Sequence, residues 1–326
     1  MPEHRPGITV TKRTGRSICM LIVHSCVKPF NSQLTKVRKE YPAGSNQLEV
    51  PKKVRKKCDV RERMIEGIRV YDIIPRNAEG RPVPTEKKGR KRVYWFAGGG
   101  WQMPPSSEHW ALFEAIARRL PDTTFSAVSY PLAPNSAAPV ALPELSRFYR
   151  RLLQDAEEAG DKVILGGDSA GGNIMLSLTL CALHEDPDSP CPSALMALSP
   201  STDLTRSNPD IEAYAEHDPI LTVPFIKSTA KAWRQDMDAT DPRVSPLYQD
   251  VTPLARRGVR VHGLTGGYDM LTPDAIRFRE KCTEAGVAGE WLHWEKQMHV
   301  FPLLCGFGLP EGKAGMEWVV DVLKRC

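Results

Sequence analysis

The sequence predicts an α/β fold with a mostly parallel, doubly wound central sheet and helices on both of its faces. Short apolar runs rich in β-branched and aromatic residues alternate along the chain with amphipathic segments, as in parallel sheets. A Gly-x-Ser-x-Gly pattern (Gly167, Ser169, Gly171) lies between such a run and a helical segment. The 326 residues, 41% of them hydrophobic, are enough to bury a sizeable core.

Seven strands and several helices are expected after residue 60. The strands are expected at 68–74, 92–96, 125–130, 163–165, 194–198, 259–264 and 289–294. Helical spacing indicates helices from Ser106 or Ser107 onward, at 145–159, at 174–182 and at 318–323. Residues 75–91 are rich in Pro, Gly and Lys and are expected to form a loop.

Two parts depart from this alternation. Residues 1–60 are expected to form a basic N-terminal arm or cap segment, with residues 61–326 as the main domain. Residues of about 205–240 interrupt the strand–helix order and are expected to be an inserted helical cap, broken into short helices by Pro219 and Pro224. The insert is too apolar for an exposed loop, and its Phe225 and Trp233 are expected to roof a pocket.

Charge is uneven along the chain. The net charge is +5, but residues 1–67 carry a net +9 and the remainder a net −4. A basic footprint over the whole protein is therefore absent, and no nucleic-acid partner is expected. The apolar run at 18–27 has some features of a signal peptide, but an amphipathic helix that packs on the body or touches a membrane surface fits it better.

The cysteines and the absence of metal motifs bear on compartment and cofactor. Eight cysteines are scattered with no Cys-x-x-Cys pair, which favours free thiols in a reducing, cytoplasmic compartment. No cofactor and no metal are expected.

The Gly-x-Ser-x-Gly pattern predicts a nucleophile on a sharp turn. In isolation it also fits a glycine-rich turn with an incidental serine. A strand, a tight turn and a helix in succession are the context in which the serine oxygen is exposed above the sheet. The helix N-terminus behind Ser169 favours the negative charge that develops there.

A serine needs a base, and the base needs an acid that orients it. Asp269 and His299 follow predicted strands in the order that this type of sheet uses. Each also fits a turn or loop role in isolation, but their joint order favours a triad. Gly98 and Gly99, directly after the strand at 92–96, and Ala170 are the predicted oxyanion-hole donors. Trp101 and Phe225 are the candidate substrate-binding residues.

Six segments carry a resemblance to a known family. They are 97–101, 130–134, 167–172, 241–247, 269–271 and 299–301. The chain resembles the hormone-sensitive-lipase-like branch of the α/β-hydrolase fold over about four-fifths of its length, and in detail the small carboxylesterases of fungal secondary-metabolite clusters. The resemblance implies a cofactor-free serine esterase with a cap over its pocket. It assigns the triad to Ser169, Asp269 and His299, and the oxyanion hole to Gly98, Gly99 and Ala170.

Two segments depart from the family pattern. Ala97 stands where the family has a histidine that braces the glycine loop, and in residues 130–135 Pro131 replaces an arginine and Asn135 replaces a glutamate. We therefore expect a loosely braced loop, and a rise in kcat when histidine is restored by Ala97→His. Phe96, Trp101 or a buried water are the alternative braces.

The leading functional hypothesis is hydrolysis of a small to medium hydrophobic ester, such as a secondary-metabolite intermediate. Acyl transfer, or another biosynthetic reaction on the same scaffold, is the second hypothesis. A non-catalytic ligand-binding protein of the same fold is the third, but such relatives typically lose the base or the acid, and this chain has both.

Overall fold

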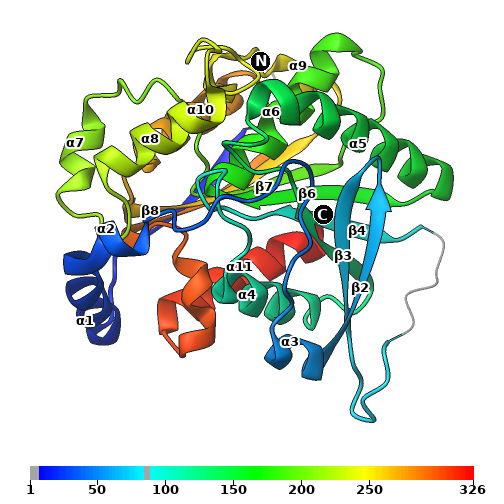
Figure 1. The fold of residues 1–326 in the computed structure, drawn as a ribbon, viewed down its shortest axis with the longest axis horizontal. Coiled ribbons are helices and arrows are strands. Elements are labelled where there is room, and N and C mark those ends of the chain that lie inside the picture. The colour runs from blue at the N-terminus through cyan, green and yellow to red at the C-terminus, as the bar shows by residue number, and fades with distance from the viewer. Residues whose placement is uncertain (1–6, 84–88) are drawn as a thin grey trace, which may run out of the picture.

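The structure, a computed structural model, describes residues 7–83 and 89–326, and within them nine strands form one sheet (Figure 1). The sheet order is β1-β9-β8-β7-β6-β4-β5-β3-β2. From β1 to β5 the neighbours are parallel, while β3 is antiparallel to β5 and β2 to β3. The strands are β1 Ile8–Arg13, β2 Cys58–Ile65, β3 Ile68–Pro75, β4 Lys91–Phe96, β5 Thr123–Ser129, β6 Lys162–Asp168, β7 Ala194–Leu198, β8 Arg260–Tyr268 and β9 Gly289–Met298. The predicted mostly parallel sheet is confirmed.

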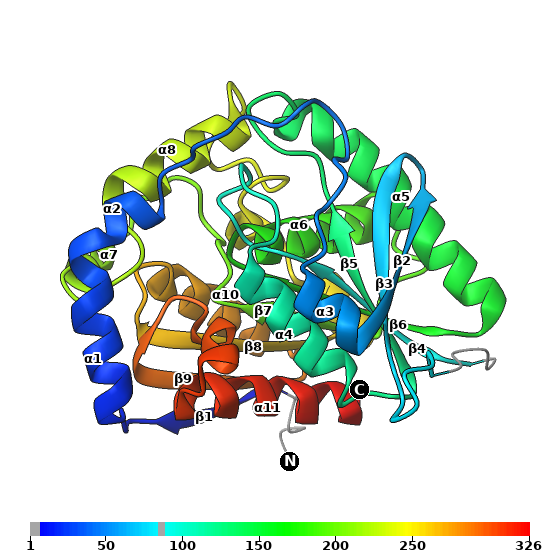
Figure 2. The ribbon, with the colours of Figure 1, turned by 60° about the horizontal axis from the view of Figure 1, so that its bottom comes forward.

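Helices cover both faces of this sheet, as predicted (Figure 2). On one face lie α5 (Ala138–Ala159), α6 (Ser169–Glu185) and α10 (Thr272–Glu284). On the other lie α4 (Ser107–Ala117) and α11 (Pro310–Arg325).

Successive side chains of each strand point to opposite faces of the sheet, and each face has its own hydrophobic core. In β4, Tyr94 and Phe96 belong to the core beneath α5 and α6, while Val93 and Trp95 belong to the core beneath α4 and α11. A central strand that is buried on both faces has a continuous run of apolar residues in the sequence. For this reason its position could be predicted.

The N-terminal segment is more integrated than expected. Residues 8–13 form β1, which pairs in parallel with β9 at the edge of the sheet. The main sheet also gains β2 from Cys58 onward, so residues 1–60 are not a separate arm. β1 is short and mostly exposed, and its basic residues hid the strand pattern. Lys52–Lys57 form the short helix α3, in which Val54 is buried.

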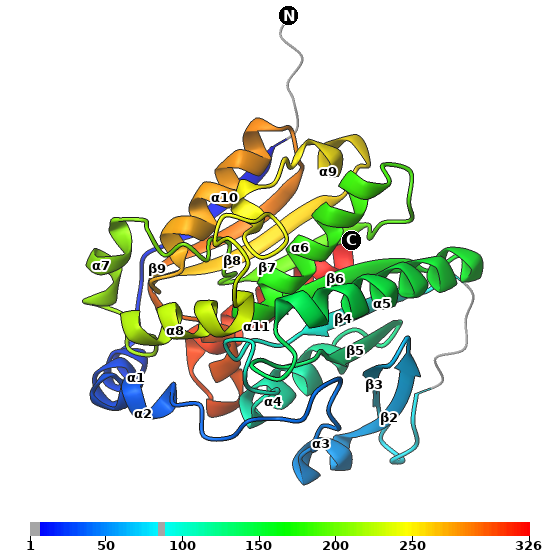
Figure 3. The ribbon, with the colours of Figure 1, turned by 45° about the horizontal axis from the view of Figure 1, so that its top comes forward.

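Between β1 and α3 the chain forms α1 (Ile18–Val27), the 3-10 helix η1 (Lys28–Phe30) and α2 (Asn31–Leu34), which lie beside the cap (Figure 3). The coil that follows is fixed to the body at Gly44, Ser45 and Leu48. No helix in the described part of the chain is long and apolar enough to span a membrane.

The residues between β7 and β8 contain two helices of the predicted insert, α7 (Asp210–Ala215) and α8 (Val223–Arg234). After them come η2 (Pro246–Tyr248) and α9 (Thr252–Arg256). The 3-10 helix η3 (Phe301–Phe307) follows β9 and leads into α11. Figure 2 shows α7 and α8 beside α1 and α2, on the side where β8 and β9 end.

Candidate active site

Ser169 lies on a tight turn between β6 and α6. Its φ of 51° is in the left-handed region, which costs energy for a non-glycine residue and is common at functional sites. The flanking glycines are required sterically. A Cβ on Gly171 would lie 1.9 Å from the carbonyl oxygen of Phe96, and one on Gly167 would lie 2.6 Å from the Gly171 backbone. The predicted strand, turn and helix are therefore present around this serine.

Asp269 and His299 lie together at the same sheet edge, after β8 and β9. Nδ1 of His299 is 3.0 Å from Oδ2 of Asp269, and both side chains are buried. The two atoms lie within ion-pair distance, but the ring N–H is not aligned on Oδ2 as a hydrogen bond requires. Such contacts can tighten when substrate binds. Oδ1 of Asp269 accepts the N–H of Leu271 at 2.9 Å, which fixes the carboxylate from its other side.

The residue after His299 is hydrogen-bonded to the end of β7, two strands away from β9 in the sheet. Val300, at φ 46°, donates its N–H to Oγ of Ser199, 3.2 Å away at the end of β7. Burial disfavours a charged His299, but the carboxylates of Asp269, Asp218 and Asp168 outweigh that penalty and raise the pKa of His299 above its ordinary value. The imidazole is therefore poised to take up a proton.

The glycine loop corrects one predicted donor. The N–H of Gly98 donates to Oδ2 of Asp168 at 2.9 Å, so it is already used and does not serve an oxyanion in this arrangement. Within residues 7–83 and 89–326, the N–H groups of Gly99, Gly100 and Ala170 have no hydrogen-bond acceptor. These are the N–H groups free to meet a developing oxyanion, so Gly100 replaces Gly98 as the candidate.

The expectation of a loose loop is also wrong. The hydroxyl of Tyr130 donates to the carbonyl oxygen of Ala97 at 2.7 Å, and Asp168 holds Gly98. Oδ1 of Asp168 also accepts Nε1–H of Trp95 at 2.9 Å, and Nε2 of His109 lies 3.0 Å from Oδ2. The brace that the structure shows was not among the alternatives considered from the sequence. It is a carboxylate directly before Ser169.

His109 is held in register by the start of α4. Its Nδ1 accepts the N–H of Ser106 at 3.1 Å in a capping box, which leaves Nε2 to face Asp168. Burial opposes ionisation of Asp168, but His109 and the hydrogen bonds from His109, Trp95 and Gly98 lower the pKa of its carboxyl below the usual range. A side chain whose ionised form is favoured therefore anchors the loop.

The insert touches this loop from above. A Cβ on Gly100 would lie 2.8 Å from Cγ2 of Thr229 and 3.1 Å from Cζ of Phe225, both on α8. The indoles of Trp101 and Trp233 stack at 5.9 Å and 12°. Both indoles are fully buried in the main core, so Trp233 is a core residue and not the pocket roof that we expected. Phe225 is only half-buried and lies beside the loop.

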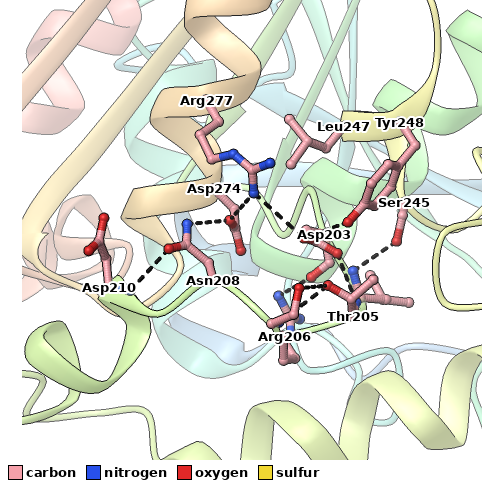
Figure 4. Close-up of polar contacts among 12 residues, drawn as sticks. Asp203, Thr205, Arg206, Asn208, Asp210, Ser245, Leu247, Tyr248, Asp274 and Arg277 are labelled. Carbon is pink, nitrogen blue, oxygen red and sulfur yellow. Dashed lines mark hydrogen bonds and ion pairs between the residues drawn. The ribbon is translucent and has the colours of Figure 1, made fainter.

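A polar cluster anchors the base of the insert (Figure 4). The Arg206 guanidinium is fully buried and donates to the carbonyl of Asp203 and to Oγ of Ser201, both at 2.7 Å. Burial lowers the pKa of Arg206 to about 10, although the carboxylates of Asp274, Asp203 and Asp269 act in the opposite direction. Arg277 contacts Asp274 of the same helix at 3.2 Å and reaches Asp203 at 3.9 Å. The cluster fixes how the insert leaves the sheet.

Sequence reasoning missed the brace and the cap contacts. His109 lies three residues after Ser106, near the predicted helix start and at capping-box spacing. This spacing was the one available signal, and nothing in the local sequence links His109 to Asp168. In the described ranges, no group of three or more His, Cys, Asp or Glu side chains could hold a metal ion.

Comparison with known proteins places the chain in a class. The profile of a family described as alpha/beta hydrolase fold matches residues 93–303. An esterase from Acinetobacter venetianus is 30% identical over 243 residues, covering 74% of this chain and 77% of that protein. A carboxylic ester hydrolase, LipN, from Mycobacterium tuberculosis is 29% identical over 247 residues, covering 71% and 62%. A hormone-sensitive lipase structure from a metagenome library superposes with a TM-score of 0.73 at 21% identity, covering 93% and 96%.

The chain is therefore a hydrolase of the carboxylesterase class. It belongs to the α/β-hydrolase fold family, in its hormone-sensitive-lipase-like branch, as the sequence motifs predicted.

Proposed function

We propose that this protein hydrolyses a small to medium hydrophobic carboxylic ester through an acyl-enzyme on Ser169. The observation that carries the proposal is the placement of Ser169, on its strained turn, at the sheet edge that also holds the His299–Asp269 pair at 3.0 Å. His299 takes the proton of the Ser169 hydroxyl as its oxygen attacks the ester carbonyl carbon. The N–H groups of Gly99, Gly100 and Ala170 stabilise the resulting oxyanion.

Collapse of the tetrahedral intermediate breaks the ester C–O bond, and His299 returns the proton to the departing alcohol. Water then attacks the acyl-enzyme with His299 again as the base, which releases the acid and restores the hydroxyl of Ser169. Asp269 keeps the imidazole oriented and favours its protonated form. No cofactor is needed for these steps.

A fluorophosphonate probe tests the proposal. We expect one covalent adduct per chain, on the peptide that contains Ser169, and no adduct in Ser169→Ala. Product analysis with p-nitrophenyl esters in the presence and absence of an acceptor alcohol then separates hydrolysis from acyl transfer. A protein that binds hydrophobic esters without reacting with the probe would be a non-catalytic receptor and contradicts the proposal.

The compartment and the natural substrate are also proposals. All eight cysteines are free thiols, which supports a reducing, cytoplasmic location. A secondary-metabolite ester as the natural substrate rests on the family resemblance alone. Activity on p-nitrophenyl esters of increasing acyl length measures the size of the pocket and narrows this choice.

We also propose that the segment from α1 to α2 contacts the surface of an anionic lipid bilayer. In the described part of the chain, five of nine exposed large hydrophobic side chains lie within residues 18–34. They are Ile18, Leu21, Ile22, Phe30 and Leu34. Residues 8–39 carry seven Lys or Arg and no Asp or Glu, so the patch favours anionic lipid over a second copy of itself.

Sedimentation with vesicles tests the bilayer contact. We expect the protein to pellet with phosphatidylserine-containing vesicles, more weakly with pure phosphatidylcholine, and less after Ile18→Ser with Ile22→Ser. The control, Met64→Ser, changes a residue outside the patch that is about as exposed as Ile22, and it should leave binding unchanged. Equal binding by all three proteins, or a concentration-dependent dimer that the patch variant abolishes, would contradict the bilayer contact.

A further inference from the structure

Asp218 is a fully buried carboxylate that joins the insert to the loop carrying the candidate acid. Its Oδ1 accepts the N–H groups of Ile220 and Leu221, both at 2.8 Å. Its Oδ2 accepts the N–H of Met270 at 3.0 Å. Met270 directly follows Asp269, so this carboxylate fixes the backbone from which the acid side chain projects.

The residue before Asp218 holds the other side of the same loop. The ring of His217 stacks on Tyr268 with 5.0 Å between centroids and an angle of 23°. Tyr268 directly precedes Asp269, so two consecutive residues of the insert hold the two neighbours of the acid. The guanidinium of Arg16 lies 5.2 Å over the same tyrosine ring, which adds a contact from the N-terminal segment.

Asp218 also adds charge to the site. Burial and the neighbouring Asp269 carboxylate together raise the pKa of Asp218 to about 7, although His299 and the N–H donors of Met270 and Leu221 act in the opposite direction. Around His299 the facing carboxylates are Asp269, Asp218 and Asp168. An additional carboxylate near an imidazole stabilises its protonated form, which is the form that exists while the ester bond breaks.

We propose that Asp218 is a positioning residue of the active site, which orients Asp269 through the backbone of its loop and, in its ionised form, adds to the negative charge that favours protonated His299. The inference rests on the proposed function, because it gives Asp218 a role in the same reaction. It makes the insert part of the catalytic machinery as well as a cover.

Asp218→Asn is the decisive variant, because it keeps the size of the side chain and one acceptor oxygen but removes the charge. We expect kcat on p-nitrophenyl butyrate to fall with little change in KM, by up to about 100-fold if the acid is misplaced by about 1 Å. We also expect the acid limb of the pH profile of kcat/KM to move to lower pH. Asp218→Ala should lower kcat further.

Asp203→Asn is the matched control. Asp203 is as buried as Asp218 and also accepts a backbone N–H in the insert, from Thr205, but it is not among the carboxylates that act on His299. The control should lose thermal stability without moving the acid limb. NMR titration of the His299 imidazole in wild type and Asp218→Asn gives the same answer without turnover, and it applies even where Asp218→Ala does not fold.

Wild-type kcat and an unmoved His299 titration in Asp218→Asn would overturn the role of Asp218 and leave the esterase proposal intact. A wild-type protein that neither hydrolyses esters nor reacts with the phosphonate contradicts the proposed function itself. The two failures are therefore distinguishable.

Discussion

The N–H of Gly98 donates to Oδ2 of Asp168 across 2.9 Å, so the loop that offers the oxyanion donors is fastened to the residue directly before the nucleophile. A Cβ on Gly98 would lie 2.9 Å from Cβ of Ser169, so the two segments are also in steric contact. The loop and the nucleophile turn therefore act as one preorganised unit.

Substitution of His109, which contacts the Asp168 carboxylate, should weaken this unit. In His109→Ala the buried carboxylate of Asp168 loses a partner, which typically costs about 1–3 kcal/mol of unfolding free energy. We expect kcat to fall by about tenfold, or 1.4 kcal/mol of transition-state free energy, because the anchor of the loop relaxes. Steady-state kinetics and denaturant unfolding check this. His184→Ala, an exposed histidine on α6, should change neither quantity, and equal behaviour of the two variants would refute the brace.

Restoring the family histidine should now be harmful. Ala97 is buried, with a carbonyl that already accepts the Tyr130 hydroxyl, so an imidazole in Ala97→His must displace packed neighbours. Overpacking of this kind typically costs about 1–3 kcal/mol. We expect the melting temperature and kcat on p-nitrophenyl acetate to fall together. Faster turnover at an unchanged melting temperature would show that the loop is loosely braced after all.

The pH profile should report the carboxylates around the base. Because the pKa of His299 is raised, kcat/KM should rise with pH through a midpoint above 6.5, the ordinary value for histidine. The sequence alone gave no reason to expect a midpoint different from 6.5. The charged imidazole also stabilises the fold, fully below pH 6.5, and this contribution is lost as pH rises through the raised pKa. A midpoint clearly below 6.5 would contradict the arrangement of charges.

Alanine substitutions of Phe225 and Trp233 should show which of the two residues lines the pocket and which belongs to the core. Phe225→Ala should change the preference for acyl chain length with a small change in melting temperature, because Phe225 is half-buried beside the glycine loop. Trp233→Ala should lower stability by about 3–5 kcal/mol, since its indole is fully buried against Trp101. Chain-length profiles and thermal unfolding of both variants measure the difference. The opposite pattern would move Trp233 to the pocket and Phe225 to the core.

The sequence predicted the features that consecutive residues encode and missed those that depend on residues far apart in the chain. The central strands and the turn at Ser169 were predictable because buried parallel strands and a Gly-x-Ser-x-Gly turn are written in consecutive residues. β1 was not predictable, because an exposed edge strand lacks a continuous apolar run. The contact of His109 with Asp168 joins residues 59 positions apart, and that of Asp218 with Met270 joins residues 52 positions apart. Neither contact was predictable, because only folding brings these residues together.

Substitution of the nucleophile tests the central claim most directly. In Ser169→Ala we expect ester hydrolysis to be lost while the melting temperature stays close to wild type, because only a hydroxyl is removed and it makes no hydrogen bond within the described chain. Removal of the nucleophile from one well-studied hydrolase costs on the order of 10⁶-fold in kcat. Turnover of p-nitrophenyl butyrate by this variant should fall to the background rate. Turnover near the wild-type rate would contradict the account.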